Sequence, residues 1–407
     1  MPGIGLRASD AIDHFDFTVD GDRSIDVAFL VTQRPNEFSA TTQAWFRRLD
    51  LPRASWSDPT PITPTASPPI RIISSQGHLH VFMGRRLQHF VSADGGSTWS
   101  ELPPITPERW VLSFDAIPDL NSIQLAYMAF IPKRSSHNPD SLSVETTRWS
   151  DHGLGTPAVL GVFEGVSPPE PKLLIRGKAV HLFYAVNRVN GGDVPDRVDA
   201  TLYHTSHTDQ PGWSRSEAIS TLGRSGGVWR SEGSGYISHI DAVNLGDSVY
   251  AFYNAAWLYV TRSGNEGAWS RVAPVVCGRT WFGPSANSSV AAAAIAGRGQ
   301  LLWIDERYQH TDRTPWNPWG FPWFLTADWA NNDVLALPLT SVPRAIGTPI
   351  ESKPERLTRD LSFAAEVRAR AGNSRIYALW PGREKVGKLP ASSGTPPTIF
   401  FLSLPPK

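Results

Sequence analysis

Charged residues recur at one position of a repeated strand pattern. A count of eleven residues back from the centre of an apolar strand reaches a charged residue in three repeats: from Phe82 to Arg71, from Phe183 to Lys172, and from Phe252 to Asp241. In another repeat the count ends beside Asp115, and Asp16 is the equivalent residue of the first repeat after a slip of two. The last two repeats give Ala292 and Arg368. If the repeats surround one axis, one cavity receives Asp16, Arg71, Asp115, Lys172 and Asp241.

Such a ring of side chains is capable of acid–base chemistry. Facing carboxylates shift each other's pKa values, so one can stay protonated as an acid while another stays ionised as a base. His14 and His239 lie two residues before Asp16 and Asp241, on the same side of each strand, and a histidine can act as general base. The catalytic candidates are Asp16, Asp115, His239 and Asp241, and the substrate-binding candidates include His14, Arg71 and Lys172. In the alternative interpretation, these polar groups only satisfy one another in a wet channel.

Two insertions add aromatic and cationic candidates. The segment 305–333 carries Trp316, Trp319, Trp323 and Trp329 among prolines. Flat aromatic faces can stack on a ligand ring, although such a loop can also fold back as a cap. The second insertion, 223–236, is rich in glycine. From these segments we predict further substrate-binding residues: Trp229, Arg230, Arg307, Tyr308, Trp316 and Trp319.

The composition excludes several classes of partner. The 407 residues include 38 Lys+Arg and 38 Asp+Glu, which is not the charge balance of a nucleic-acid binder or an anionic-membrane binder. Cys277 is the single cysteine, so no disulfide framework forms within the chain, and no zinc-type spacing occurs. No secretory signal pattern or long apolar run is present. We expect a cytoplasmic monomer, unless a signal has been removed, with no cofactor and no metal.

The chain consists of strand repeats of about fifty residues, a length typical of propeller blades. The clearest repeat, 70–105, contains four short apolar strands separated by turns, and similar repeats occupy 172–219 and 239–275. The second strands of seven repeats are centred near Phe29, Phe82, Tyr127, Phe183, Phe252, Trp303 and Leu379. We predict a single all-β propeller domain over 1–407 with seven four-stranded blades, six being the alternative. A strand near Leu6 would complete the last blade and close the ring.

One turn of the clearest repeat carries a recognisable motif. Residues 92–99 read S-A-D-G-G-S-T-W, which resembles the Asp-box, or BNR repeat, of the sialidase-like propellers. In that motif Asp94 would bond turn amides and Trp99 would pack between blade sheets. The resemblance implies a carbohydrate partner. Sialidase activity itself is not expected, because Arg71 lies in I-R-I-I, which lacks the aromatic residue and the proline of the sialidase F/Y-R-I-P motif.

Three classes of function stay open. A carbohydrate-active enzyme would be a glycoside hydrolase using two carboxylates, or a lyase that holds a uronate carboxyl with Arg71 or Lys172. A propeller lectin would repeat its binding residues in every blade, whereas the polar inner-strand residues of this chain differ from blade to blade. This asymmetry favours an enzyme with one axial site, hydrolase ahead of lyase. The third class is a propeller recruited for other small-molecule chemistry or as an interaction scaffold.

Overall fold

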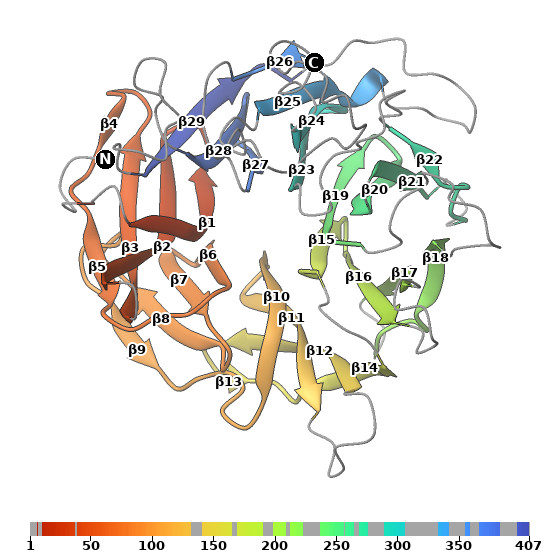
Figure 1. Cartoon of the computed structure of the whole chain (residues 1–407), viewed down its shortest axis with the longest axis horizontal. Helices are drawn as coiled ribbons and strands as arrows, with labels where there is room; N and C mark the ends of the chain where they lie inside the picture. Colours follow the sequence, from red (N-terminus) through yellow and green to blue (C-terminus); the bar gives the residue numbers. More distant parts are fainter. Residues whose placement is uncertain are drawn as a thin grey trace, which may run out of the picture.

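The computed structural model of the chain is a ring of seven β-sheets around a central axis (Figure 1). It describes residues 6, 10–36, 39–131, 141–164, 169–189, 198–208, 212–222, 237–255, 257–263, 268–275, 289–305, 333–341, 355–358, 366–382 and 397–406. Every sheet is an antiparallel meander whose first strand lies nearest the axis. The seven-bladed propeller predicted from the sequence is therefore confirmed.

The first three blades occupy the N-terminal half of the chain. Blade 1 consists of β1 (Ala11–Asp20), β2 (Ser24–Asn36), β3 (Ser39–Asp50) and β4 (Ser55–Trp56), with β5 (Thr60–Thr63) also paired to β3. Blade 2 consists of β6 (Ile70–Ser75), β7 (His78–Met83), β8 (Gln88–Ser92) and β9 (Ser100–Leu102). Blade 3 consists of β10 (Trp110–Asp119), β11 (Ser122–Ile131), β12 (Ser141–Ser150) and β13 (Gly153–Leu154), with β14 (Ala158–Glu164) also paired to β12.

The remaining four blades follow in chain order. Blade 4 consists of β15 (Lys172–Arg176), β16 (Ala179–Val189), β17 (Val198–His207) and β18 (Glu217–Leu222). Blade 5 consists of β19 (His239–Leu245), β20 (Ser248–Ala255), β21 (Trp257–Arg262) and β22 (Ala273–Pro274). Blade 6 consists of β23 (Val290–Ile295), β24 (Arg298–Asp305), β25 (Asp333–Pro338) and β26 (Glu355–Arg356), with the short 3₁₀ helix η2 (Leu339–Ser341). Blade 7 consists of β27 (Arg368–Ala371), β28 (Ile376–Gly382) and β29 (Thr398–Leu404).

The apolar core lies between neighbouring blades. The second strand of each blade is covered by a sheet on both sides, so it reads as a nearly continuous apolar run, and all seven predicted second-strand centres are at most 2% exposed. Between blades 1 and 2, for example, Phe46 and Leu30 pack with Ile70 and Val81. Full burial of one such side chain stabilises the fold by about 1.5–3 kcal/mol. Packing along each inter-blade seam therefore holds the ring together.

The ring closes between blade 7 and blade 1. Tyr377, Leu379 and Ile399 of blade 7 share one apolar cluster with Phe15 and Phe29 of blade 1. Leu6 packs against this cluster, but residues 1–5 and 7–9 lie outside the described part of the chain. The described residues of blade 7 form three strands, and the predicted closing strand stays a prediction.

The turn at residues 92–99 has the predicted local structure. The backbone N–H of Thr98 donates to Asp94 Oδ1 (2.9 Å), and the Thr98 hydroxyl donates to Asp94 Oδ2 (2.6 Å). Gly95 and Gly96 adopt φ of 70° and 93°, values that favour glycine. The Trp99 ring packs edge-on against Phe46 of blade 1 at 5.5 Å between centroids. The motif therefore stabilises a turn and an inter-blade contact.

No helix in the described ranges is long and apolar enough to cross a membrane.

Candidate active site

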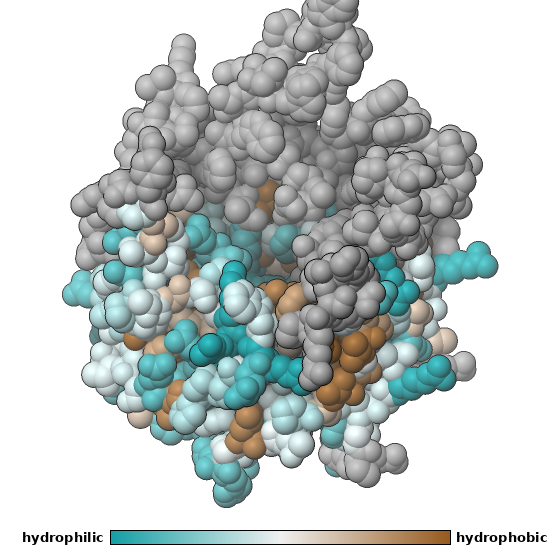
Figure 2. Space-filling model, turned by 60° about the horizontal axis from the view of Figure 1, so that its bottom comes forward, coloured by the Kyte–Doolittle hydropathy of each residue, from teal (hydrophilic) through white to brown (hydrophobic). Residues whose placement is uncertain are grey.

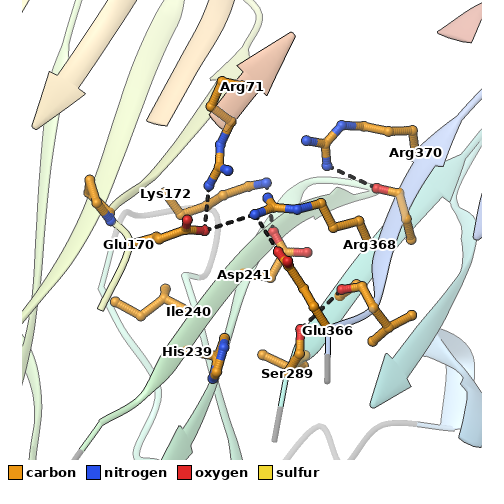
Figure 3. A pocket seen from close by; sticks show the side chains of 15 residues that line it. Arg71, Glu170, Lys172, His239, Ile240, Asp241, Ser289, Glu366, Arg368 and Arg370 are labelled. Atoms are coloured by element: carbon orange, nitrogen blue, oxygen red, sulfur yellow. Dashed lines mark hydrogen bonds and ion pairs between the residues drawn. The ribbon is translucent and has the colours of Figure 1, made fainter. Parts of the chain in front are cut away.

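The inner strands of blades 2, 4, 5, 6 and 7 surround one polar hollow at the axis (Figure 3). Its empty space is about 430 Å³, counting the part that is open to solvent. Its charged and histidine lining residues are Arg71, Glu170, Lys172, His239, Asp241, Glu366, Arg368 and Arg370. Each of them lies on or just before the first strand of a blade, so blade geometry alone brings these distant segments together.

The three predicted aspartates each bridge two neighbouring blades. In every case the Oδ2 atom accepts a backbone N–H from the inner strand of the next blade: Ile72 to Asp16 (3.1 Å), Leu173 to Asp115 (2.9 Å) and Ala292 to Asp241 (2.7 Å). The aspartates are at most 5% exposed. Because a buried carboxylate needs hydrogen-bond partners, these contacts fix the inner strands relative to one another.

The second oxygen of each aspartate pairs with a cation. The ion pairs join Arg71 Nε to Asp115 Oδ1 (3.0 Å), Lys172 Nζ to Asp241 Oδ1 (2.8 Å) and Arg370 Nη2 to Asp16 Oδ1 (3.0 Å). Burial works to raise the pKa of Asp115, but the attraction of Lys172 and Arg71 outweighs it and lowers that pKa below its ordinary value. The aspartates therefore also position the cations around the hollow.

Two glutamates approach each other across the hollow. Arg71 Nη2 donates to Glu170 Oε2 (2.5 Å), and Arg368 Nη2 donates to the same oxygen (3.1 Å). The same Arg368 nitrogen also forms an ion pair with Glu366 Oε1. Figure 3 shows Arg71 and Arg368 converging on Glu170, with Glu366 on the far side of the Arg368 guanidinium. The two carboxylate oxygens that share this nitrogen therefore lie within about 6 Å of each other, two hydrogen-bond lengths.

The surroundings push the pKa values of the two glutamates apart. For Glu170, burial works to raise the pKa, but the attraction of Arg71 and Arg368 outweighs it and the pKa falls well below its ordinary value. For Glu366, burial raises the pKa, the charge of Glu170 adds to this, and Arg368 offsets only part of it. At the same pH, Glu366 therefore holds a proton more readily than Glu170, an arrangement typical of an acid–base pair.

The two histidines flank this pair. Burial lowers the pKa of His239 to about 4, so the imidazole is neutral at neutral pH. The charge of His14 acts on Glu170, Glu366 and His239, which places His14 near all three. In the described structure, His14 Nδ1 and Arg368 Nε are buried without a hydrogen-bond partner. Such atoms are expected to bond a ligand or an ordered water.

The structure gathers the predicted site residues in part. Arg71, Lys172, His239 and Asp241 line the hollow, whereas Asp16 and Asp115 lie behind it against Arg370 and Arg71. The catalytic role predicted for the aspartates and His239 stays a prediction. Six further candidates lie outside the described residues: Trp229, Arg230, Arg307, Tyr308, Trp316 and Trp319.

Glu170 and Glu366 are not among the predicted site residues, although the sequence contains a signal for both. They lie two residues before Lys172 and Arg368, the same offset that selects His14 and His239. Because side chains alternate along a strand, an offset of two returns to the same side. Applied to every blade, this rule would have found both glutamates.

Within the described ranges, no group of three or more His, Cys, Asp or Glu side chains has an arrangement that could hold a metal ion.

Comparison with known proteins supports the fold. No protein-family model and no curated protein matches this chain. Among solved structures, a puromycin-hydrolysing peptidase of Mycobacterium tuberculosis is similar with a TM-score of 0.51 and 11% identity, over 98% of this chain and 54% of that one. This likeness shows the β-propeller fold alone.

Two glycosidase structures are similar at lower TM-scores. An α-L-arabinofuranosidase of Fusarium graminearum gives 0.46 at 12% identity, over 99% of this chain and 95% of that one. A sialidase of Trypanosoma rangeli gives 0.41 at 13% identity, over 84% of this chain and 56% of that one. The chain thus spans about half the length of the sialidase and of the peptidase.

Proposed function

We propose that the protein is a carbohydrate-active enzyme that hydrolyses glycosidic bonds in the axial hollow, with Glu366 as the general acid and Glu170 as the ionised carboxylate. The observation that carries this proposal is the pair of carboxyl groups held by one Arg368 nitrogen. Two carboxyl groups with opposite protonation are the usual machinery of glycoside hydrolysis.

The upper limit of about 6 Å between the two bonded oxygens lies below the roughly 6.5–9.5 Å of the inverting form of the reaction, so we assign the retaining form. Glu366 gives its proton to the leaving oxygen as the bond from that oxygen to the anomeric carbon breaks. A Glu170 oxygen attacks the anomeric carbon and forms a glycosyl ester. Glu366, now ionised, takes a proton from water, and the resulting hydroxide displaces Glu170. Arg71 and Arg368 keep Glu170 ionised and oriented throughout.

The charge balance favours hydrolysis over the lyase alternative. Lyase chemistry would need Arg71 or Lys172 to hold a uronate carboxyl, but Arg71 already bonds Asp115, Glu170 and the Ile70 carbonyl. Lys172 is paired with Asp241. All four cations among the described lining residues contact a carboxylate, so a second anion would have to displace one. A neutral sugar avoids that cost.

The test is an activity screen on neutral and uronate-containing oligosaccharides, following new reducing ends and the absorbance of unsaturated products. We expect reducing ends from a neutral substrate, and a fall in kcat of about 10²–10⁴-fold in Glu366→Gln and Glu170→Gln. Glu101→Gln, on the exposed edge strand β9, is the matched control and should keep full turnover. Unsaturated products would indicate a lyase, and binding without turnover in every variant would indicate a lectin.

A further inference from the structure

We propose that Trp110, packed against Arg85, is a sugar-binding platform beside the axial hollow, which receives a substrate residue beyond the two that the cleaved bond joins. This inference rests on the proposed function. It concerns a different surface from the acid–base pair, so it has a test of its own.

Trp110 carries an exposed aromatic ring that packs against a guanidinium. The residue is 50% exposed, although it is the first residue of an innermost strand. The Arg85 guanidinium carbon lies 4.1 Å from the centroid of the indole, and the backbone N–H of Val111 donates to the Arg85 carbonyl (2.8 Å). The Arg85 guanidinium of blade 2 therefore covers one face of the indole. The exposed surface of Trp110 is the part of the ring that this guanidinium leaves uncovered.

Trp110 lies on β10, a strand that contacts the residues of the axial site from outside the hollow. Three residues after Trp110, the Ser113 hydroxyl donates to the Pro169 carbonyl (3.0 Å), next to Glu170. Two residues further on, Asp115 holds Arg71. At about 3.3 Å per residue, Trp110 begins roughly 10 Å along the strand from Ser113. Figure 1 shows β10 at the inner edge of the ring, beside β15.

Leu112 gives β10 a second exposed apolar side chain near Trp110. It is 37% exposed and lies at the bulge between Val111 and Ser113, whereas Val111 is buried. Figure 2 shows apolar patches among hydrophilic ones over the described surface. A sugar ring has an apolar C–H face and a hydroxyl edge, so a fixed indole beside a guanidinium matches both parts of it.

The experiment compares a neutral oligosaccharide with an aryl glycoside of one sugar residue. In Trp110→Ala we expect KM for the oligosaccharide to rise about tenfold and the kinetics on the aryl glycoside to stay unchanged. Trp110→Phe, which keeps an aromatic face, should recover most of the loss. Leu120→Ala at the β10–β11 turn, where Leu120 is 94% exposed, is the control and should match wild type. Equal KM changes for both substrates, or none, would overturn the platform.

A binding measurement separates this proposal from the proposed function. Calorimetry with the same oligosaccharide needs no turnover. Weaker binding in Trp110→Ala than in wild type and Leu120→Ala would support the platform even if no substrate is hydrolysed. Equal binding in all three proteins, or none in wild type, would contradict it.

Discussion

At the scale of single residues, two groups of carboxylates with different partners surround the hollow. The aspartates at the inner-strand positions bond neighbouring backbones and cations, whereas the two glutamates two residues earlier share a cation across the hollow. The sequence pattern predicts the first group because a charged residue interrupts an apolar strand. The sequence pattern predicts the two glutamates less clearly, because Glu170 lies in a proline-rich segment in which strand alternation is not visible.

The proposed roles of the two glutamates predict how turnover depends on pH. The lowered pKa of Glu170 places the acidic limb of kcat/KM below the ordinary glutamate range, and the raised pKa of Glu366 places the alkaline limb above it. Activity falls at low pH as Glu170 gains a proton and at high pH as Glu366 loses one. The measurement is a pH profile of wild type and Glu366→Gln on a substrate with an activated leaving group. An alkaline limb that persists in Glu366→Gln would rule out Glu366 as its source.

The buried ion pair gives a stability prediction. Asp241→Asn removes the carboxylate that Lys172 Nζ contacts in a largely buried position, so we expect the free energy of unfolding to fall by about 3 kcal/mol. Asp50→Asn breaks the exposed pair with Arg53 and should cost less than about 1 kcal/mol. Denaturant unfolding measures both changes. Equal costs would show that burial does not strengthen the axial ion pair.

At the scale of elements, hairpin register decides which predictions hold. In blades 2, 4, 5 and 7 the predicted pairs are the observed ones: Arg71 with Phe82, Lys172 with Phe183, Asp241 with Phe252, and Arg368 with Leu379. In blades 1 and 3 the aspartates are opposite alanines, Asp16 opposite Ala28 and Asp115 opposite Ala126. In blade 6 the residue opposite Trp303 is Val290 and not the predicted Ala292. The hairpins differ in length from blade to blade, so a fixed count of eleven residues does not keep register in all of them.

Paired histidines in blades 2 and 4 predict loss of stability in acid. His80 bonds His89 (3.1 Å) and His181 bonds His204 (2.9 Å), and a tryptophan of the next blade contacts each pair. Burial lowers the pKa to about 4 for His80, about 3 for His89 and about 4 for His181. Because the unfolded chain binds these protons more readily, stability is full above about pH 6.5 and falls as the pH drops toward 4.

Each of these histidines should contribute about 1.4 kcal/mol per pH unit across that window. Urea unfolding at pH 7 and pH 5 measures the slope. The variant His80→Gln with His181→Gln removes two of the groups and should show a shallower dependence. The same slope in wild type and variant would mean that other groups cause it.

At the scale of the whole molecule, the seven-fold ring is the feature most completely predicted from sequence. All seven second-strand centres lie in the second strands of the blades, because those strands are apolar on both faces and stand out from their neighbours. The axial site is only partly predictable. Which inner-strand side chains meet depends on register and on contacts across several blades, and no single repeat contains that information.

Ring closure gives the prediction at this scale. Tyr377 of blade 7 is buried in the cluster shared with blade 1, and its hydroxyl donates to Asp22 Oδ1 (3.1 Å). Tyr377→Phe removes only that hydrogen bond and should cost about 1 kcal/mol. Tyr377→Ala also leaves a cavity at the closing seam and should cost about 3–5 kcal/mol. Denaturant unfolding distinguishes them, and equal costs would mean that this seam contributes little packing energy.

The central claim is that Glu366 protonates the leaving group of a glycoside in the axial hollow. The most direct measurement is kcat/KM of wild type and Glu366→Gln on aryl glycosides whose leaving groups range from poor to activated. We predict a loss of about 100-fold or more on the poorest leaving group and a small loss on the most activated one, which needs no proton. An equal loss on every leaving group, or no loss on any, would contradict the account.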